Sequence, residues 1–148
     1  MPVTRDQLIE ILAEADPVAL AAGMNPGMSS WLPLTSYLTN PEQASVLVLG
    51  WGSTWGPIAA AARRVRETGR SIAVTHIRHL NPLPANTGDV LGAYRRVVVP
   101  EMNLGQLTAL LRAKYLVDVA SYTRVRGLPI SPAELAPHLI DLIDAKEV

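Results

Sequence analysis

The chain has 148 residues and no cysteine, and its 13 basic and 13 acidic side chains give a net charge of zero. Its length and its 49% hydrophobic content are typical of one globular domain and exclude a disordered chain. The lack of cysteine excludes a disulfide scaffold, a thiolate zinc site and a cysteine-ligated iron–sulfur cluster held by this chain alone. Because the sequence has no apolar run of about 20 residues and no signal-peptide pattern, we expect a cytoplasmic protein without membrane contact.

The charges are unevenly distributed along the chain. Residues 1–45 carry −4, residues 46–128 carry +7 and residues 129–148 carry −3. The arginines of the basic middle are not interleaved with aromatic side chains, so this pattern does not favour nucleic-acid binding. We predict instead that the two signs meet within the chain or within an assembly.

Residues 1–44 are predicted to form an arm separate from the main domain. Thr4 to Gln7 has the spacing of a capping box, and the apolar periodicity that follows predicts a helix over about 5–15. The stretch from Gly23 to Pro41 is rich in proline and glycine but also carries Met, Trp, Leu and Tyr side chains. It therefore either packs over the core or offers a docking surface to a partner.

Residues 45–148 are predicted to form an α/β domain. Short apolar runs predict strands at 46–49, 71–77, 96–99 and 117–120. Between and after them, helices are predicted at 57–68, 86–94, 104–115 and 131–144. Alternation of strands and helices at this spacing indicates a largely parallel sheet covered on both faces.

A glycine-rich turn, Gly50 to Gly56, follows the first predicted strand. Its glycines permit a tight turn ahead of a helix N-terminus, whose free N–H groups attract anions. Trp55 stands where the dinucleotide fingerprint needs its third glycine, and Arg78 follows the second strand in place of an acidic residue. Two interpretations stay open: a turn that only packs the helix onto the sheet, or an NADP or anion site. The candidate contacts of such a site are Gly50, Gly52, Ser53, Thr54, Gly56 and Arg78.

Glu101 and Asn103 follow the third predicted strand at the same edge of the sheet. Both are candidate contacts for a ligand or partner. For Asn103 we favour helix capping, and for Glu101 a loop-tying role through backbone N–H groups is equally favoured.

The three histidines do not indicate a metal site. Of His76 and His79 we expect one to be packed and one to be at the surface, and we expect His138 to be structural. Catalytic triads, paired catalytic carboxylates and metalloprotease motifs do not occur in the sequence, so no catalytic residue is assigned.

Four ordered blocks resemble the C-terminal region of the α subunit of 2-oxoacid:ferredoxin oxidoreductases, with the 2-oxoglutarate type closest. They are Val46–Ile58, His76–Pro84, Val99–Leu107 with Leu111–Asp118, and more weakly Val125–Pro129. The resemblance implies a transketolase C-terminal-like domain, which is a three-layer sandwich around a mostly parallel sheet of about five strands. Residues 1–44 match nothing in the family, which leaves open a fragment, a fusion or a small relative with a new arm.

The resemblance also implies a function. The complete enzymes convert a 2-oxoacid and coenzyme A into acyl-CoA and CO₂ and pass the electrons to ferredoxin. Thiamine diphosphate, magnesium and an iron–sulfur cluster are then expected in other domains or in the β subunit, and none in this chain. The implied role is a non-catalytic domain that packs against the β subunit and the remaining α-subunit domains, without turnover by itself. A stand-alone nucleotide-binding, anion-binding or protein-interaction module is the alternative, and a homo-oligomer stays open.

Overall fold

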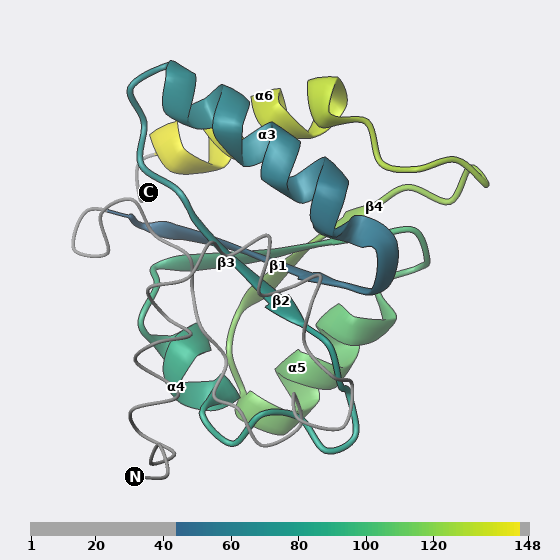
Figure 1. The fold of residues 1–148 in the computed structure, drawn as a ribbon. Coiled ribbons are helices and arrows are strands. Elements are labelled where there is room, and N and C mark those ends of the chain that lie inside the picture. Colours follow the sequence, from purple (N-terminus) through teal and green to yellow (C-terminus); the bar gives the residue numbers. More distant parts are fainter. Residues whose placement is uncertain (1–43, 146–148) are drawn as a thin grey trace, which may run out of the picture.

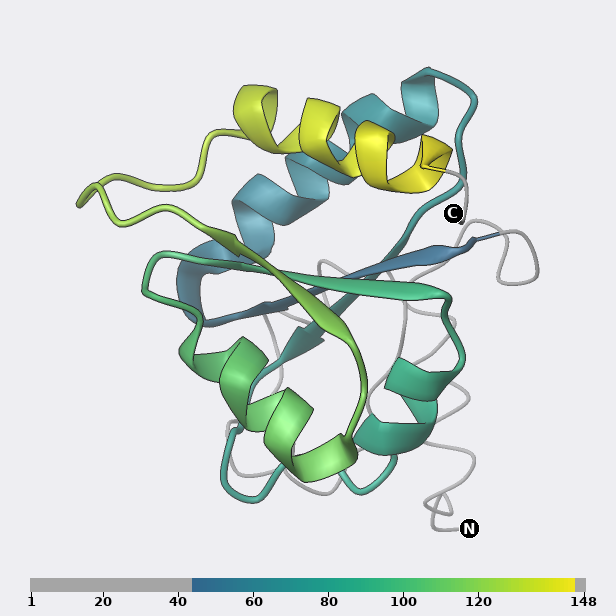
Figure 2. The same ribbon diagram turned by 180° about the vertical axis from the view of Figure 1, so that it is seen from behind.

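A computed structural model describes residues 44–145, in which a parallel sheet lies between two layers of helices (Figures 1 and 2). The four strands are β1 (Val46–Trp51), β2 (Ala73–Ile77), β3 (Arg96–Glu101) and β4 (Val119–Thr123), in the order β2-β1-β3-β4. The helices are η2 (Gly52–Thr54), α3 (Trp55–Glu67), α4 (Thr87–Gly92), α5 (Gln106–Tyr115) and α6 (Pro132–Asp144). Residues 1–43 of the predicted arm, including its helix over 5–15, lie outside the described residues.

The two sides of β1 explain the layers. Val46 to Leu49 are all fully buried, and alternate side chains point to opposite faces of the sheet. Val46 and Val48 join a core beneath α3 and α6, whereas Leu47 and Leu49 join a second core with residues of α4 and α5. A strand buried on both faces needs a continuous apolar run, which is why this run predicted a parallel sheet.

The predicted α/β class is confirmed within residues 44–145, and each strand and helix predicted there exists with ends within three residues. Within residues 44–145 the sheet has four strands instead of about five. β3 also runs on through Pro100 to Glu101, two residues beyond its predicted end at Val99. Its pairing with β1 ends at Val48↔Val98, so the missing N–H of Pro100 interrupts no bond to β1.

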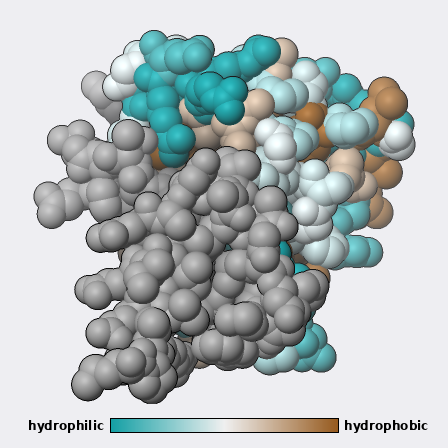
Figure 3. Space-filling view, in the orientation of Figure 1, coloured by the Kyte–Doolittle hydropathy of each residue, from teal (hydrophilic) through white to brown (hydrophobic). Residues whose placement is uncertain are grey.

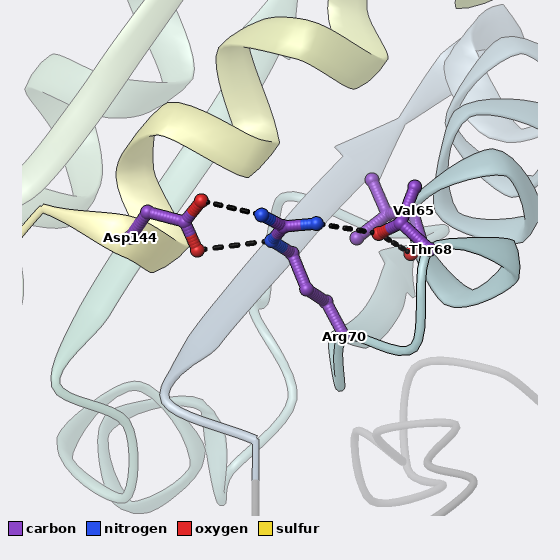
Figure 4. A network of polar contacts seen from close by, with 4 residues as sticks. All are labelled: Val65, Thr68, Arg70 and Asp144. Atoms are coloured by element: carbon purple, nitrogen blue, oxygen red, sulfur yellow. Dashed lines mark hydrogen bonds and ion pairs between the residues drawn. The ribbon is translucent and has the colours of Figure 1, made fainter.

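The layer of α3 and α6 presents a hydrophilic outer surface, seen at the top of Figure 3. Arg70, just after α3, forms a two-point ion pair with Asp144 at the end of α6, with N···O distances of 2.9 and 2.6 Å (Figure 4). A hydrogen bond from Arg70 lowers the pKa of the Asp144 carboxyl. Glu134 on α6 also pairs with Arg126 at 3.2 Å and, at a longer 3.6 Å, with Arg124. The basic middle of the chain therefore meets the acidic last helix, as predicted.

Among the residues that the structure describes, no helix is both long and apolar enough to cross a membrane.

Candidate functional site

The carboxyl ends of parallel strands meet at one edge of the sheet, where α/β proteins place ligands. The segment Gly50 to Gly56 runs from the end of β1 through η2 into the first turn of α3 at this edge. Arg78 follows β2, and Asn103 follows β3. The first and last of these turns are joined, because the indole Nε1 of Trp51 donates a hydrogen bond to Glu101 Oε1 at 3.3 Å. Arg78 is linked to the glycine turn through His76, on whose imidazole it acts electrostatically.

The three glycines between Gly50 and Gly56 differ in why the structure needs a glycine there. A Cβ on Gly50 would lie 2.7 Å from Ile58 Cδ1 of α3, so Gly50 allows the helix to pack close to the strand. Gly52 adopts φ +60°, a left-handed conformation that favours glycine. Gly56 has neither constraint: it is exposed in the first turn of α3 with nothing within 4 Å of an added Cβ. Packing and backbone conformation account for the first two glycines and leave Gly56 unexplained.

The two hydroxyl groups of this turn differ in what they reach. Thr54 is buried, and its Oγ1 donates to the Trp51 carbonyl at 2.8 Å while accepting from the Trp51 N–H at 3.1 Å. The Thr54 hydroxyl is therefore used inside the turn. Ser53, in contrast, is exposed in η2, just ahead of α3.

His76 lies beneath this turn, on β2. Its ring meets the ring of Trp55 edge to face at 5.6 Å between centroids, and its Nδ1 is buried without a hydrogen-bond partner among the described residues. Burial, and then the charge of Arg78, lower the pKa of His76 to about 4, so the ring is neutral near pH 7. The expected split into one packed and one surface histidine is wrong, because His76 and His79 are both half-buried.

Glu101 is fully buried at the end of β3, and all its hydrogen bonds run to the protein. Oε1 accepts from the Leu107 N–H at 2.8 Å as well as from Trp51. Oε2 accepts from the N–H and the hydroxyl of Thr108, at 3.2 and 3.0 Å. These backbone donors belong to the first turn of α5, where the helix dipole also stabilises a carboxylate. The geometry matches the loop-tying interpretation of Glu101.

Asn103 supports the same helix start. Its Oδ1 accepts hydrogen bonds from the Gly105 and Gln106 N–H groups at 2.8 and 3.0 Å, so it binds an orphan donor of the first turn, although the N-cap residue of α5 is Gly105. A contact of Asn103 or Glu101 with a ligand or partner remains a prediction. The same holds for the six candidates at the other two strand ends: Gly50, Gly52, Ser53, Thr54, Gly56 and Arg78.

One contact at this edge could not be predicted from the sequence. The bond between Trp51 and Glu101 joins residues 50 positions apart, and only the pairing of β1 beside β3 brings them together. The third histidine, His138, lies on α6 against the ring of Tyr122, at 4.9 Å between centroids, which agrees with a structural role. Burial, and then Arg124, lower the pKa of His138. In residues 44–145 no group of three or more His, Cys, Asp or Glu side chains could hold a metal ion.

Comparison with curated proteins finds similarity to oxidoreductase subunits. The chain is 53% identical over 92 residues to the 2-oxoglutarate oxidoreductase subunit KorA of Mycobacterium tuberculosis, which covers 62% of this chain and 14% of KorA. It is 34% identical over 107 residues to the α subunit of 2-oxoacid:ferredoxin oxidoreductase 1 of Aeropyrum pernix, covering 69% of this chain and 17% of that subunit. The chain thus spans less than a fifth of either relative. No family model matches it.

Comparison with solved structures agrees. The 2-oxoglutarate:ferredoxin oxidoreductase of Magnetococcus marinus superposes with a TM-score of 0.67 and 26% identity, covering 86% of this chain and 21% of that one. A split-gene transketolase superposes with a TM-score of 0.56 at 15% identity, covering 84% of this chain and 44% of that one, which supports the transketolase-like fold alone.

Proposed function

We propose that this chain, a homologue of a segment of 2-oxoacid:ferredoxin oxidoreductase α subunits, is a non-catalytic domain that supports subunit assembly. The reaction of the assembly is the coenzyme A-dependent oxidative decarboxylation of a 2-oxoacid, with 2-oxoglutarate as the substrate type. The observation that carries the proposal is the 53% identity to KorA over a segment that is only 14% of KorA. We place the assembly in the cytoplasm.

The geometry of the carboxyl edge supports a non-catalytic role. A carboxylate that moves a proton must reach the substrate with one of its oxygens. Both oxygens of Glu101 are instead occupied by donors of the domain itself, and Asn103 is occupied in the same way. The most polar groups of the turn after β3 therefore hold the domain together.

The cofactors of the proposed reaction fit this chain poorly. The sequence contains no cysteine that could ligate an iron–sulfur cluster. Magnesium prefers clustered oxygen ligands, and residues 44–145 contain no group of three or more acidic or histidine side chains that could hold a metal ion. In this proposal thiamine diphosphate, magnesium and the cluster are bound by the β subunit and by the remaining parts of the α subunit.

A segment exchange tests the proposal. The matched segment of KorA is replaced by the corresponding residues of this chain, and the full-length chimera is produced with the β subunit of that enzyme. Reduction of methyl viologen is then measured with 2-oxoglutarate and coenzyme A. We expect the chimera to form the α/β complex and to retain most of the activity, because the segment supplies architecture and no reacting group.

Two controls make the result decisive. The 148-residue chain alone should give no viologen reduction, and 2-oxoacid-dependent reduction by it would contradict a non-catalytic role. A chimera that is soluble but does not associate with the β subunit would contradict the assembly role.

A further inference from the structure

The amino ends of the strands meet at the edge of the sheet opposite the carboxyl edge. Residues 94–95 lead into β3 there, and residues 114–116 end α5 ahead of β4, which pairs with β3 through Val97↔Val119. α4 and the start of β1 lie at the right side of Figure 2, and α5 runs toward that side. We call the following five residues the amino-edge patch: Tyr94, Arg95, Lys114, Tyr115 and Leu116.

Leu116 is the residue of this patch that its own domain does not explain. Its side chain is 90% exposed, and its backbone has φ +54°, the left-handed conformation that favours glycine. No other residue of 44–145 except glycine has a positive φ. The Leu116 N–H donates to the Arg112 carbonyl at 3.0 Å and closes α5, a role for which glycine is the usual residue. A leucine here adds strain and gains almost no burial, which indicates a contact outside residues 44–145.

The rest of the chain arrives at this same edge. Ala44 precedes β1 and packs against the same core cluster as Tyr94 and Tyr115. The backbone N–H of Arg96 donates to the Ser45 carbonyl at 3.1 Å, so the start of β1 is fixed beside the start of β3. Residues 1–43 are therefore tethered next to the patch. A tether gives a high effective concentration, which favours these residues over any separate chain as the occupant.

Charge favours the same occupant. Residues 44–145 hold eleven basic and seven acidic side chains, a net +4 that already includes the acids of α6. Residues 1–43 hold one arginine and five acids, a net −4. Within residues 44–145 neither Arg95 nor Lys114 forms an ion pair. The stretch 23–41 adds Met, Trp, Leu and Tyr side chains, which are typical of the apolar centre of an interface.

We infer that residues 1–43 dock on the amino-edge patch of their own chain. Apolar side chains of the stretch 23–41 cover Leu116, and acidic side chains of the arm neutralise Arg95 and Lys114, because opposite charges at the rim set the register of a contact. Of the two interpretations of the arm, packing on its own domain is thus the one we adopt. The inference does not depend on the proposed function.

The test is hydrogen–deuterium exchange, followed by mass spectrometry, on the full 148-residue chain. Leu116→Gly removes the side chain while suiting the left-handed backbone, so the domain keeps its fold. Leu104→Gly is the matched control, since Leu104 is 89% exposed but lies just after β3 at the carboxyl edge. A second variant, Arg95→Gln with Lys114→Gln, removes the two charges and leaves Leu116 in place.

We expect the backbone amides of residues 23–41 to exchange at least fivefold faster in Leu116→Gly and in the Arg95→Gln, Lys114→Gln variant than in the unsubstituted chain. Leu104→Gly should stay within twofold of the unsubstituted chain. The amides of β1 should exchange equally in all four proteins, which shows that the domain is intact. Exchange in residues 23–41 that is the same in Leu116→Gly as in Leu104→Gly would overturn the inference.

Carbodiimide cross-linking identifies the occupant, because it joins carboxylates to lysine amines and the chain has only two lysines, Lys114 and Lys146. In an equal mixture of ¹⁵N-labelled and unlabelled chains, we expect Lys114 to be joined to an acidic residue of 1–43 within one chain. Products that join a labelled chain to an unlabelled one through Lys114 would show that a second copy occupies the patch, and the inference would be wrong.

Discussion

The turn after β1 and the turn after β3 leave the same edge of the sheet and touch through Trp51 and Glu101, yet they use their polar groups differently. The β3 turn is closed: Glu101 accepts four hydrogen bonds and Asn103 two, all from the protein. The β1 turn is more open, with Ser53 and Gly56 exposed and His76 Nδ1 buried without a partner among the described residues.

This difference shows that a polar residue just after the carboxyl end of a strand is weak evidence for a ligand site. In the turn after β3, Glu101 and Asn103 bind backbone N–H groups at the start of α5. They do so because the first N–H groups of a helix have no partner within the helix and must be satisfied by other acceptors. The turn after β1, in contrast, keeps Ser53 and Gly56 exposed where η2 leads into α3. Three predictions test this contrast.

The largest effect is expected at the closed turn. Glu101→Ala leaves the Trp51 indole and the Leu107 and Thr108 N–H groups without their buried acceptor. Such losses cost about 1–3 kcal/mol per buried group and are partly relieved by relaxation, so we expect a loss of about 2–4 kcal/mol in the free energy of unfolding. Urea unfolding followed by circular dichroism measures it.

Glu101→Gln is the matched control, because it keeps the size of the side chain and one acceptor oxygen. It should lose less stability than Glu101→Ala. An alanine variant as stable as the unsubstituted chain would show that the four hydrogen bonds do not hold this turn, and the contrast between the turns would disappear.

The second prediction separates two glycines of the open turn. Gly50→Ala forces a Cβ against Ile58, which is fully buried, and should cost about 1–3 kcal/mol of unfolding free energy. Gly56→Ala enters open space in a helix and should stabilise the chain by about 0.5–1 kcal/mol. Thermal unfolding of the two variants side by side checks both signs. A destabilising Gly56→Ala would mean that this turn is as tightly packed as the turn after β3.

The third prediction concerns pH. Because the pKa of folded His76 is about 4 and that of an unfolded histidine about 6.5, the unfolded chain binds the extra proton between these values. The stability that this neutral histidine contributes is therefore fully present above about pH 6.5 and is lost as the pH falls toward 4. After allowing for the partial exposure of the ring, the loss should be about 1–2 kcal/mol.

The measurement is the free energy of unfolding at several pH values for the unsubstituted chain and for His76→Gln. The variant should show a flatter acid limb, and the pH dependence that remains includes the contribution of His138, whose pKa is also lowered. Equal slopes for both proteins would place the orphaned His76 nitrogen in contact with solvent.

The local features of the molecule could be predicted from the sequence. Apolar runs such as Val46 to Leu49 predicted buried parallel strands, and Pro132 after Ser131 predicted the start of α6. Asn103 could be assigned to the start of α5 because its partners, Gly105 and Gln106, lie two and three residues away. The resemblance to oxidoreductase α subunits was also readable, since it depends on ordered blocks of residues.

The α/β class, the positions of the elements and the similarity to oxidoreductase α subunits can all be predicted from the amino-acid sequence, because each depends on neighbouring residues or on linear order. The fold sets the other features: Glu101 is enclosed by hydrogen-bond donors, Arg70 reaches Asp144, and the loop after β4 projects with Val125 and Leu128 exposed. These features depend on contacts between residues up to 74 positions apart, which the order of strands in the sheet brings together.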